Sequence, residues 1–320
     1  MATAAQAASS SQAQDHALPD GLLRYVWQEG AWQQIRLCLL AGLVFPLTMV
    51  PLELQRRIVD RAIGNENLRL LVLLGAVYFA AVLLQGALKY LLRFYRGVVS
   101  ERAIRLLRQR LQAAVASRGD RADGEGRGET VSIVTAEVER VGRFLGEALS
   151  EPVLQIGIFV SILGYMLVVE PLVALVSLLF FVPQLIFVPL LQRLVNRRAR
   201  RKVELLREVG ELIVGASADQ DDRYQDRLGW IYRVRLQYYA LKFLIKLLNN
   251  LLNQLAPLAV LMVGGWLVID GETTVGVVVA FITGFMRLAE PSRELLAYYR
   301  LAAETGVQYR LITRWLSRPA

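Results

Sequence analysis

The sequence predicts an all-α membrane protein with six transmembrane helices and long cytoplasmic extensions. Of its 320 residues 55% are hydrophobic and the mean hydropathy is +0.39, which is high for a soluble domain. Six apolar segments are long enough to cross a bilayer. Two arginine-rich stretches, about 93–150 and 193–246, keep the helical spacing of apolar residues between these segments. We therefore expect membrane helices that continue as rods into the cytoplasm.

The chain begins with a polar segment and then an amphipathic one. Residues 1–17 are rich in alanine, serine and glutamine and carry neither a basic start nor an apolar centre. We expect a disordered tail there and not a signal peptide. Residues 20–35 place Trp27 and Trp32 among polar residues, which is typical of an interfacial elbow helix at headgroup level. Residues 18–320 then form one transmembrane domain.

The six spans alternate with short turns and long helical extensions. The predicted spans are residues 37–54, 68–90, 153–169, 172–191, 243–269 and 275–286. Short turns follow the first, third and fifth spans, whereas the second and fourth continue as helices until glycine- and charge-rich breaks at 117–128 and 215–222. As one helix, residues 172–214 would measure about 65 Å, against about 30 Å of hydrocarbon. The excess length must lie in water or against partner helices.

The distribution of basic residues predicts the orientation of the chain. The turns near Glu170 and Asp270 carry no lysine or arginine, whereas the long intervals carry many. The positive-inside rule therefore places the long intervals and both termini in the cytoplasm. The turn near Asn65 is flanked by arginines, but one short loop does not outweigh two strongly basic intervals. We expect an integral protein of a bacterial inner membrane.

Composition argues against several classes of function. The net charge is +9, but the arginines flank apolar spans without a nucleic-acid-binding motif, so we expect no nucleic-acid partner. His16 is the only histidine and Cys38 the only cysteine, so neither a histidine-based metal cluster nor an intrachain disulfide can form. We expect no catalytic, cofactor-binding or metal-binding residue in this chain.

Several segments, taken in order, carry a family resemblance. The most telling is residues 264–281, which read Gly-Gly-Trp-Leu-Val, then Gly-Glu-Thr-Thr-Val-Gly, then Ala-Phe. Further matching segments are 22–32, 50–60, 127–138 and 302–316. Together they resemble the membrane domain of ABC exporters, from the elbow helix to the last helix before the ATPase domain. The resemblance implies an ABC-exporter-like six-helix domain that works as a homodimer, or as a heterodimer with a paralogous membrane domain.

The resemblance also implies that ATP hydrolysis drives transport, yet the ATPase motifs do not occur in this sequence. A P-loop needs Gly-x-x-x-x-Gly-Lys-Ser/Thr, and no Gly-Lys dipeptide and no Leu-Ser-Gly-Gly-Gln signature is found. The sequence ends at Ala320, about where the family's ATPase domain would begin. We therefore expect no ATP hydrolysis by this chain alone, and ATP and Mg²⁺ on a separate ATPase subunit.

In the family, the cytoplasmic tips of the rods insert into the ATPase. The candidate tip residues here are Arg118, Asp120, Asp123, Glu125, Ala216, Asp219, Asp221 and Asp222. Both tips lack the apolar or aromatic anchor that usually dominates an interface. Two interpretations are open: the partner ATPase recognises a polar surface, or coupling to an ATPase has been lost.

Polar and small residues in the last two spans are the other candidates. The candidate cavity-lining residues are Asn249, Asn250, Asn253, Gln254, Arg287 and Glu290. Polar groups at membrane depth face a cavity or other protein groups, so these side chains either line a substrate path or hold helices together. Gly276, Ala280 and Gly284 recur every four residues and predict a seam of close helix packing, within the chain or across a dimer.

Three hypotheses for function follow. The first is a permease subunit that moves substrate by alternating access, powered by a separately encoded ATPase. The second is a proton-driven transporter on the same fold, in which Glu53, Glu170 and Glu290 are the carboxylates of interest. The third is a non-transporting scaffold or regulator, which predicts a packed bundle without a water-filled cavity. The neutral amides of span five argue weakly against a strongly charged substrate.

Overall fold

The computed structural model describes residue 19 and residues 21–118, 137–214 and 221–317. The elements are α2 (Leu22–Leu47), α3 (Val50–Arg57), the π-helix η1 (Ile58–Ile63), α4 (Leu68–Arg118), α6 (Val138–Glu147), α7 (Ser150–Val169), α8 (Pro171–Val214), α9 (Asp221–Ile269) and α10 (Val275–Ser317). Within these ranges, six helical segments are long and apolar enough to cross a membrane. The predicted fold class is confirmed. The expected tail, 1–17, lies outside the described residues.

The first span is interrupted where glycine and proline occur. α2 contains non-helical backbone angles at Gly30, within the segment 20–35 that we expected to form the elbow helix. Pro46 lies in the last turn of α2, and the Thr48 hydroxyl donates a hydrogen bond to the Phe45 carbonyl at 2.5 Å. α3 then begins with Pro51 in its first turn, a position where the missing N–H of proline costs nothing.

Local chemistry explains the turns at the ends of the helical hairpins. The Asn67 side chain caps α4, because its Oδ1 accepts a hydrogen bond from the Leu70 N–H at 3.0 Å. After α9, Gly271 adopts a left-handed conformation with φ of 78°. The Glu272 N–H donates to the Leu267 carbonyl at 2.9 Å and the Gly271 N–H to the Val268 carbonyl at 3.2 Å. This pair of bonds is a Schellman motif, which ends the helix sharply.

The helices form two compact units. Unit 1 comprises residues up to Tyr165 and from Arg287 onward, and unit 2 comprises Met166–Met286. The core of unit 1 is formed by α2, α4, α6 and α10, and its largest fully buried side chains are Tyr25, Leu107, Leu111, Phe144 and Tyr309. The rings of Tyr25 and Tyr309 lie 5.4 Å apart, and the Tyr309 hydroxyl donates to the Pro19 carbonyl at 2.7 Å. These contacts fix the elbow helix against the last helix.

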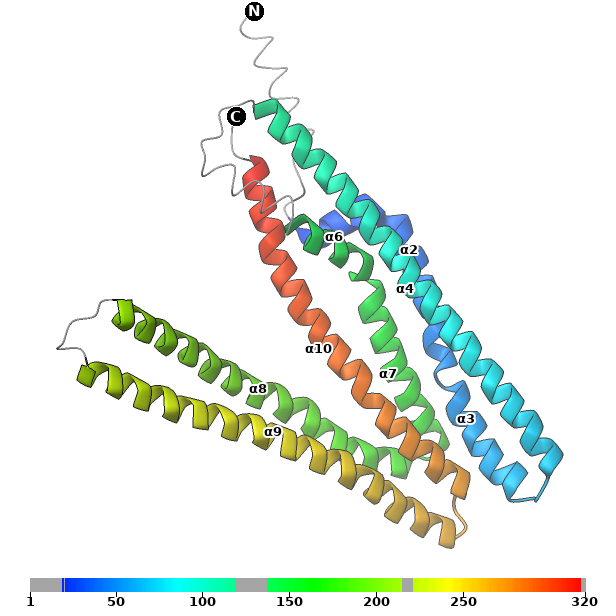
Figure 1. The fold of residues 1–320 in the computed structure, drawn as a ribbon. Coiled ribbons are helices and arrows are strands. Elements are labelled where there is room, and N and C mark those ends of the chain that lie inside the picture. Colours follow the sequence, from blue (N-terminus) through cyan, green and yellow to red (C-terminus); the bar gives the residue numbers. More distant parts are fainter. Residues whose placement is uncertain (1–18, 20, 119–136, 215–220, 318–320) are drawn as a thin grey trace, which may run out of the picture. The chain divides into compact units, whose positions relative to one another are not determined.

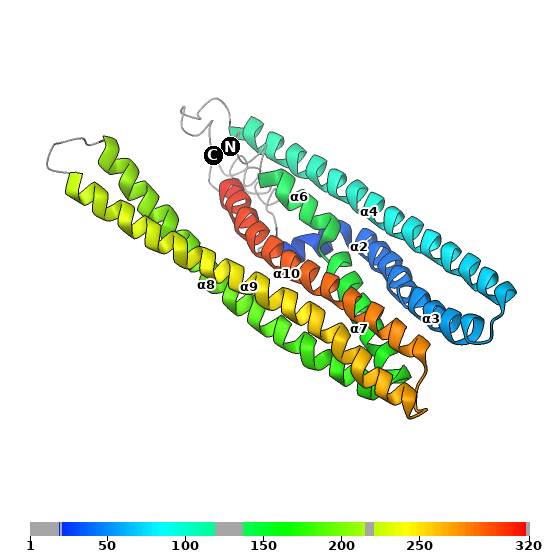
Figure 2. The same cartoon turned by 60° about the horizontal axis from the view of Figure 1, so that its bottom comes forward.

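In unit 2, α8 and α9 form a long helical hairpin, and the two helices lie side by side in both views (Figures 1 and 2). Leu205, Val209, Ile231 and Val234 form a buried cluster in the part of the hairpin beyond the predicted spans. At the other end, the rings of Phe181 and Phe285 pack edge to face at 6.4 Å. The Leu205 cluster therefore gives the hairpin an apolar core of its own in the part that extends beyond the predicted spans.

The small residues predicted to form a packing seam, Gly276, Ala280 and Gly284, are all buried. A Cβ at Gly264 of α9 would lie 2.8 Å from a Val278 methyl group of α10. The two helices therefore approach closely on the stretch that carries the three small residues.

Another close approach joins α4 and α6 in unit 1. A Cβ on Gly146 would lie 2.5 Å from the Arg96 carbonyl oxygen and would overlap the Ser100 hydroxyl. We expect Gly146→Ala to destabilise the protein by about 1–3 kcal/mol, because the backbone must move to admit the methyl group. Thermal unfolding in detergent measures the effect. Gly86→Ala is the matched control: no atom lies within 4 Å of its Cβ, so replacing this helical glycine should stabilise slightly. If the two variants have the same unfolding temperature, the close contact at Gly146 is contradicted.

Candidate functional site

Unit 1 contains a cavity of about 960 Å³ between α4, α6, α7 and α10. It begins beside Tyr78 and Ile162, within the predicted spans, and extends along α4 to Glu101, eleven residues beyond the predicted span. Its charged lining residues are Lys89, Arg93, Arg96, Glu101, Arg143, Glu147, Glu151, Arg287, Glu290 and Glu294. The cavity thus joins membrane depth to the polar part of the helices, and its walls carry charges of both signs.

The α4 wall of the cavity follows from helical spacing. Tyr78, Val82, Gln85, Lys89 and Arg96 recur at intervals of three, four or seven residues, which places their side chains on one face of the helix. The opposite face carries large apolar side chains that are exposed, among them Phe79, Leu83, Tyr90 and Phe94. α4 therefore presents polar groups to the cavity, whereas its other face is suited to lipid.

One ion pair crosses the cavity wall from α4 to α7. Arg96 Nη1 donates to Glu151 Oε2, and the other oxygen of Glu151 accepts a hydrogen bond from Gln155 Nε2 at 2.6 Å. The side chains of Arg96 and Glu151 are only 10% and 13% exposed. Arg96 Nε and Nη2 are buried without a hydrogen-bond partner among the described residues. The guanidinium is thus held by a single carboxylate, which makes the pair sensitive to loss of either partner.

The structure divides the predicted cavity residues between the two units. Arg287 and Glu290 line the cavity of unit 1. In unit 2, Gln184 Nε2 of α8 donates to Asn249 Oδ1 at 2.6 Å and to Asn253 Oδ1 at 3.4 Å. Asn250 and Gln254 are exposed. Of the two interpretations of this amide cluster, the geometry of Asn249 and Asn253 corresponds to hydrogen bonding between helices.

Sequence reasoning missed most of the cavity residues. Arg96, Glu147, Glu151 and Gln155 were not among the candidates, and Lys89 was not placed in a cavity. A signal was present, because Gln85, Lys89, Arg96 and Ser100 share one face of an otherwise apolar helix. The opposing carboxylates lie more than forty residues further along the chain, so their proximity needed the tertiary structure.

The predicted tip residues lie at the margin of the described chain. Arg118 is the last residue of α4, and Asp221 and Asp222 are the first residues of α9. The other candidates, Asp120, Asp123, Glu125, Ala216 and Asp219, lie outside the described residues.

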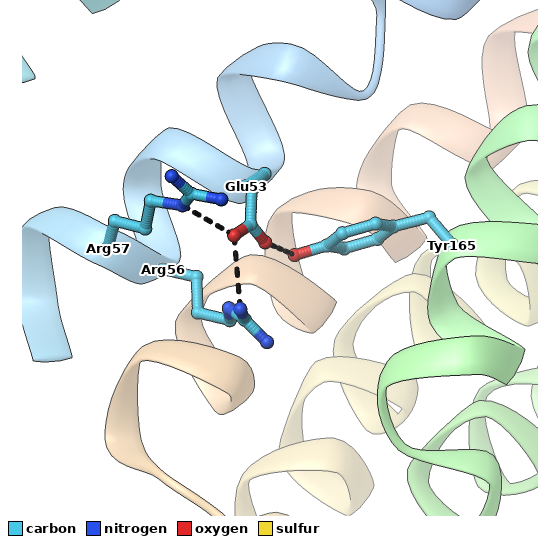
Figure 3. A network of polar contacts seen from close by, with 4 residues as sticks. All are labelled: Glu53, Arg56, Arg57 and Tyr165. Carbon is cyan, nitrogen blue, oxygen red and sulfur yellow. Dashed lines mark hydrogen bonds and ion pairs between the residues drawn. The ribbon is translucent and has the colours of Figure 1, made fainter.

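A second polar cluster joins α3 to α7 (Figure 3). Glu53 Oε1 accepts hydrogen bonds from Arg56 Nη2 at 3.0 Å and Arg57 Nε at 2.7 Å, and Glu53 Oε2 accepts one from the Tyr165 hydroxyl at 3.0 Å. The Glu53 side chain is 25% exposed. All three bonds favour the ionised carboxylate, so the geometry corresponds to a structural latch more than to a proton carrier.

We expect Tyr165→Phe to destabilise the protein by about 0.5–1.5 kcal/mol, because only the hydroxyl bond from α7 to α3 is lost. Thermal unfolding in detergent measures this change. Tyr299→Phe provides the control, since Tyr299 is 71% exposed, and it should unfold like the parent protein. An unchanged unfolding temperature in Tyr165→Phe would show that this hydrogen bond contributes nothing.

Among the described residues, no group of three or more histidine, cysteine, aspartate or glutamate side chains could hold a metal ion.

Comparison with known proteins identifies the family. Residues 39–214 match the sequence profile of the ABC transporter transmembrane region, which covers more than half of the chain. No curated protein matches the chain significantly. The matched segment runs from α2 to the end of α8 and includes the α4, α6 and α7 walls of the cavity. The chain belongs to the ABC transporter transmembrane region family and is an integral membrane transport domain.

Proposed function

We propose that this chain is the permease subunit of an ABC-type transporter, which moves substrate by alternating access and is powered by a separately encoded ATPase. The observation that carries the proposal is the polar cavity of about 960 Å³ within a membrane transport domain. Ionisable groups near membrane depth commonly mark substrate paths. A scaffold without transport activity would be expected to lack such a cavity, so the cavity supports transport.

The lengths of the helices support coupling to a cytoplasmic subunit. α4, α8 and α9 contain 51, 44 and 49 residues, which correspond to about 77, 66 and 74 Å. Each is at least twice the thickness of about 30 Å of hydrocarbon. Such rods can transmit movement between a soluble ATPase and the membrane, and ATP and Mg²⁺ would bind to that ATPase.

Exposed apolar side chains support assembly with lipid and a second membrane domain. On α8 and α9 the large exposed apolar residues include Leu175, Leu179, Ile186, Leu258, Leu261 and Met262. Lipid or a partner helix must cover these surfaces. We infer a homodimer, or a heterodimer with a paralogous membrane domain, in a bacterial inner membrane with both termini in the cytoplasm.

A proton-driven mechanism is the second candidate because of one observation. Glu290 lines the cavity and, within the described part of the chain, forms no ion pair. A carboxylate in that position could exchange protons with the cavity. Glu53, in contrast, is already bonded to two arginines and a tyrosine.

Purification from native membranes followed by reconstitution distinguishes the two mechanisms. We expect an ATPase subunit to co-purify, and we expect ATP to drive transport in vesicles after the proton gradient has been collapsed. If the chain purifies alone, and transport stops when the gradient is collapsed, the ATP-driven proposal is wrong and the proton-driven one is supported.

A further inference from the structure

The charges that line the cavity are largely without partners. Of the ten charged lining residues, Arg96 and Glu151 pair with each other and Arg143 pairs with Glu139. Within the described part of the chain, the other seven have neither an ion pair nor a side-chain hydrogen bond; they are Lys89, Arg93, Glu101, Glu147, Arg287, Glu290 and Glu294. Three cationic and four anionic side chains are thus left to interact with whatever enters the cavity.

Two pairs of like charges come from different walls, although Glu101 also lies on α4 and Arg287 on α10. Lys89 and Arg93 lie four residues apart on α4, and Glu290 and Glu294 lie four residues apart on α10. Side chains at this spacing project from one face of a helix. Each helix therefore offers a pair of like charges to the cavity.

A ligand with a single charge would satisfy only one of these two pairs. An anion would pair with Lys89 and Arg93 but would bring a like charge close to Glu290 and Glu294, and a cation would do the reverse. Like charges disfavour such a complex, most strongly where the surroundings exclude water. A neutral apolar ligand would displace water from all four side chains without replacing their hydrogen bonds, which is costly. A molecule with a charge of each sign avoids these penalties.

We propose that the cavity binds a zwitterion, with its ammonium group at Glu290 and Glu294 of α10 and its carboxylate or phosphate at Lys89 and Arg93 of α4. The volume of about 960 Å³ lies within the range that accommodates small molecules, 300–1,000 Å³. A short peptide with free termini and the headgroup of a zwitterionic phospholipid share this chemistry. The inference rests on the proposed function, because it takes this cavity as the substrate site.

Binding of matched ligands to the full chain, purified with any bound ATPase and without ATP, tests the proposal. The first probe is tetra-alanine with free termini, compared by calorimetric titration with its N-acetylated and its C-amidated forms. The second probe is a short-chain phosphatidylethanolamine, compared with its N-acetylated form. We expect one free zwitterion to bind at least tenfold more tightly than its blocked forms. Preference within the peptide set identifies a peptide source, and preference within the lipid set identifies a headgroup. If blocking changes affinity less than twofold in both sets, the proposal is wrong.

Paired substitutions assign each end of the ligand to a wall. In Glu290→Gln with Glu294→Gln, the preference for a free amine should disappear, whereas the preference for the anionic group should persist. Lys89→Gln with Arg93→Gln should do the opposite, a distinction that general destabilisation would not produce. Lys242→Gln is the control, because this exposed lysine of α9 does not line the cavity. If both double variants keep both preferences, the zwitterion binds elsewhere and the proposal fails.

The binding test of this inference and the transport test of the proposed function can fail independently of each other. Binding that depends on charge, in a protein whose transport does not respond to ATP, would contradict the ATP-driven function and leave this inference intact. ATP-driven transport with no preference for zwitterions would contradict this inference alone.

Discussion

Replacing Glu151 with alanine is expected to destabilise the protein by about 3–5 kcal/mol, the range measured when one member of a buried ion pair is removed. The guanidinium of Arg96 would lose its only ion-pair partner among the described residues while its Nε and Nη2 stay buried. Equilibrium unfolding in mixed micelles measures this difference in free energy. The loss is the largest that we expect from any single substitution in unit 1.

Two controls separate the buried pair from ordinary surface charge. Glu204→Ala removes the partner of Arg201 in an exposed pair, whose side chains are 50% and 59% exposed, and should cost less than about 1 kcal/mol. Arg96→Met combined with Glu151→Met removes both charges together and should be far less harmful than Glu151→Ala alone. If Glu151→Ala costs no more than Glu204→Ala, the account of the Arg96–Glu151 pair is incorrect.

The second large effect concerns coupling to the ATPase. Reversing the acidic charges at the tip that joins α8 to α9, by changing Asp219, Asp221 and Asp222 to lysine, should reduce ATP-driven transport at least about tenfold. That loss corresponds to about 1.4 kcal/mol of interaction at the interface. The physical reason is that this tip offers charge in place of an apolar anchor, so a partner that recognises it must present complementary charge. Transport by reconstituted vesicles containing the ATPase measures the effect.

Glu272→Lys serves as the control for the tip substitutions. Glu272 lies in the turn between α9 and α10, at the other end of the hairpin, and is exposed. Reversing the charge at Glu272 should leave ATP-driven transport unchanged. If the tip substitutions also leave transport unchanged, this tip does not couple the chain to an ATPase, and the interpretation that coupling has been lost gains support.

The spans and their turns could be predicted because they depend on local chemistry. Apolar run length defined the membrane segments, and the turns after η1 and α9 contain asparagine and glycine at the positions where capping needs them. The kink at Gly30 was not predicted, since both sides of it read as amphipathic helix. Local signals therefore locate an element well and its internal kinks less well.

The cavity could not be predicted at the same level, because its chemistry is distributed along the chain. Arg96 and Glu151 are 55 residues apart, and Glu290 and Glu294 come from the last helix. The amides of span five drew attention because they are conspicuous in an apolar run, yet Asn249 and Asn253 bond to Gln184. A single sequence shows which polar residues share a helix face, but not which helices bring their polar faces together.

Accessibility of one engineered cysteine tests the central claim of ATP-driven alternating access. Cys38 is the only cysteine of the chain, so Cys38→Ser gives a background for Val82→Cys, at a partly exposed position of α4 that lines the cavity. In membranes that contain the ATPase, we predict that an impermeant maleimide labels this cysteine from the cytoplasmic side without nucleotide. We predict labelling from the opposite side when the ATPase is trapped with ATP and vanadate. Labelling that ignores nucleotide, or that switches sides only with the proton gradient, would contradict the account.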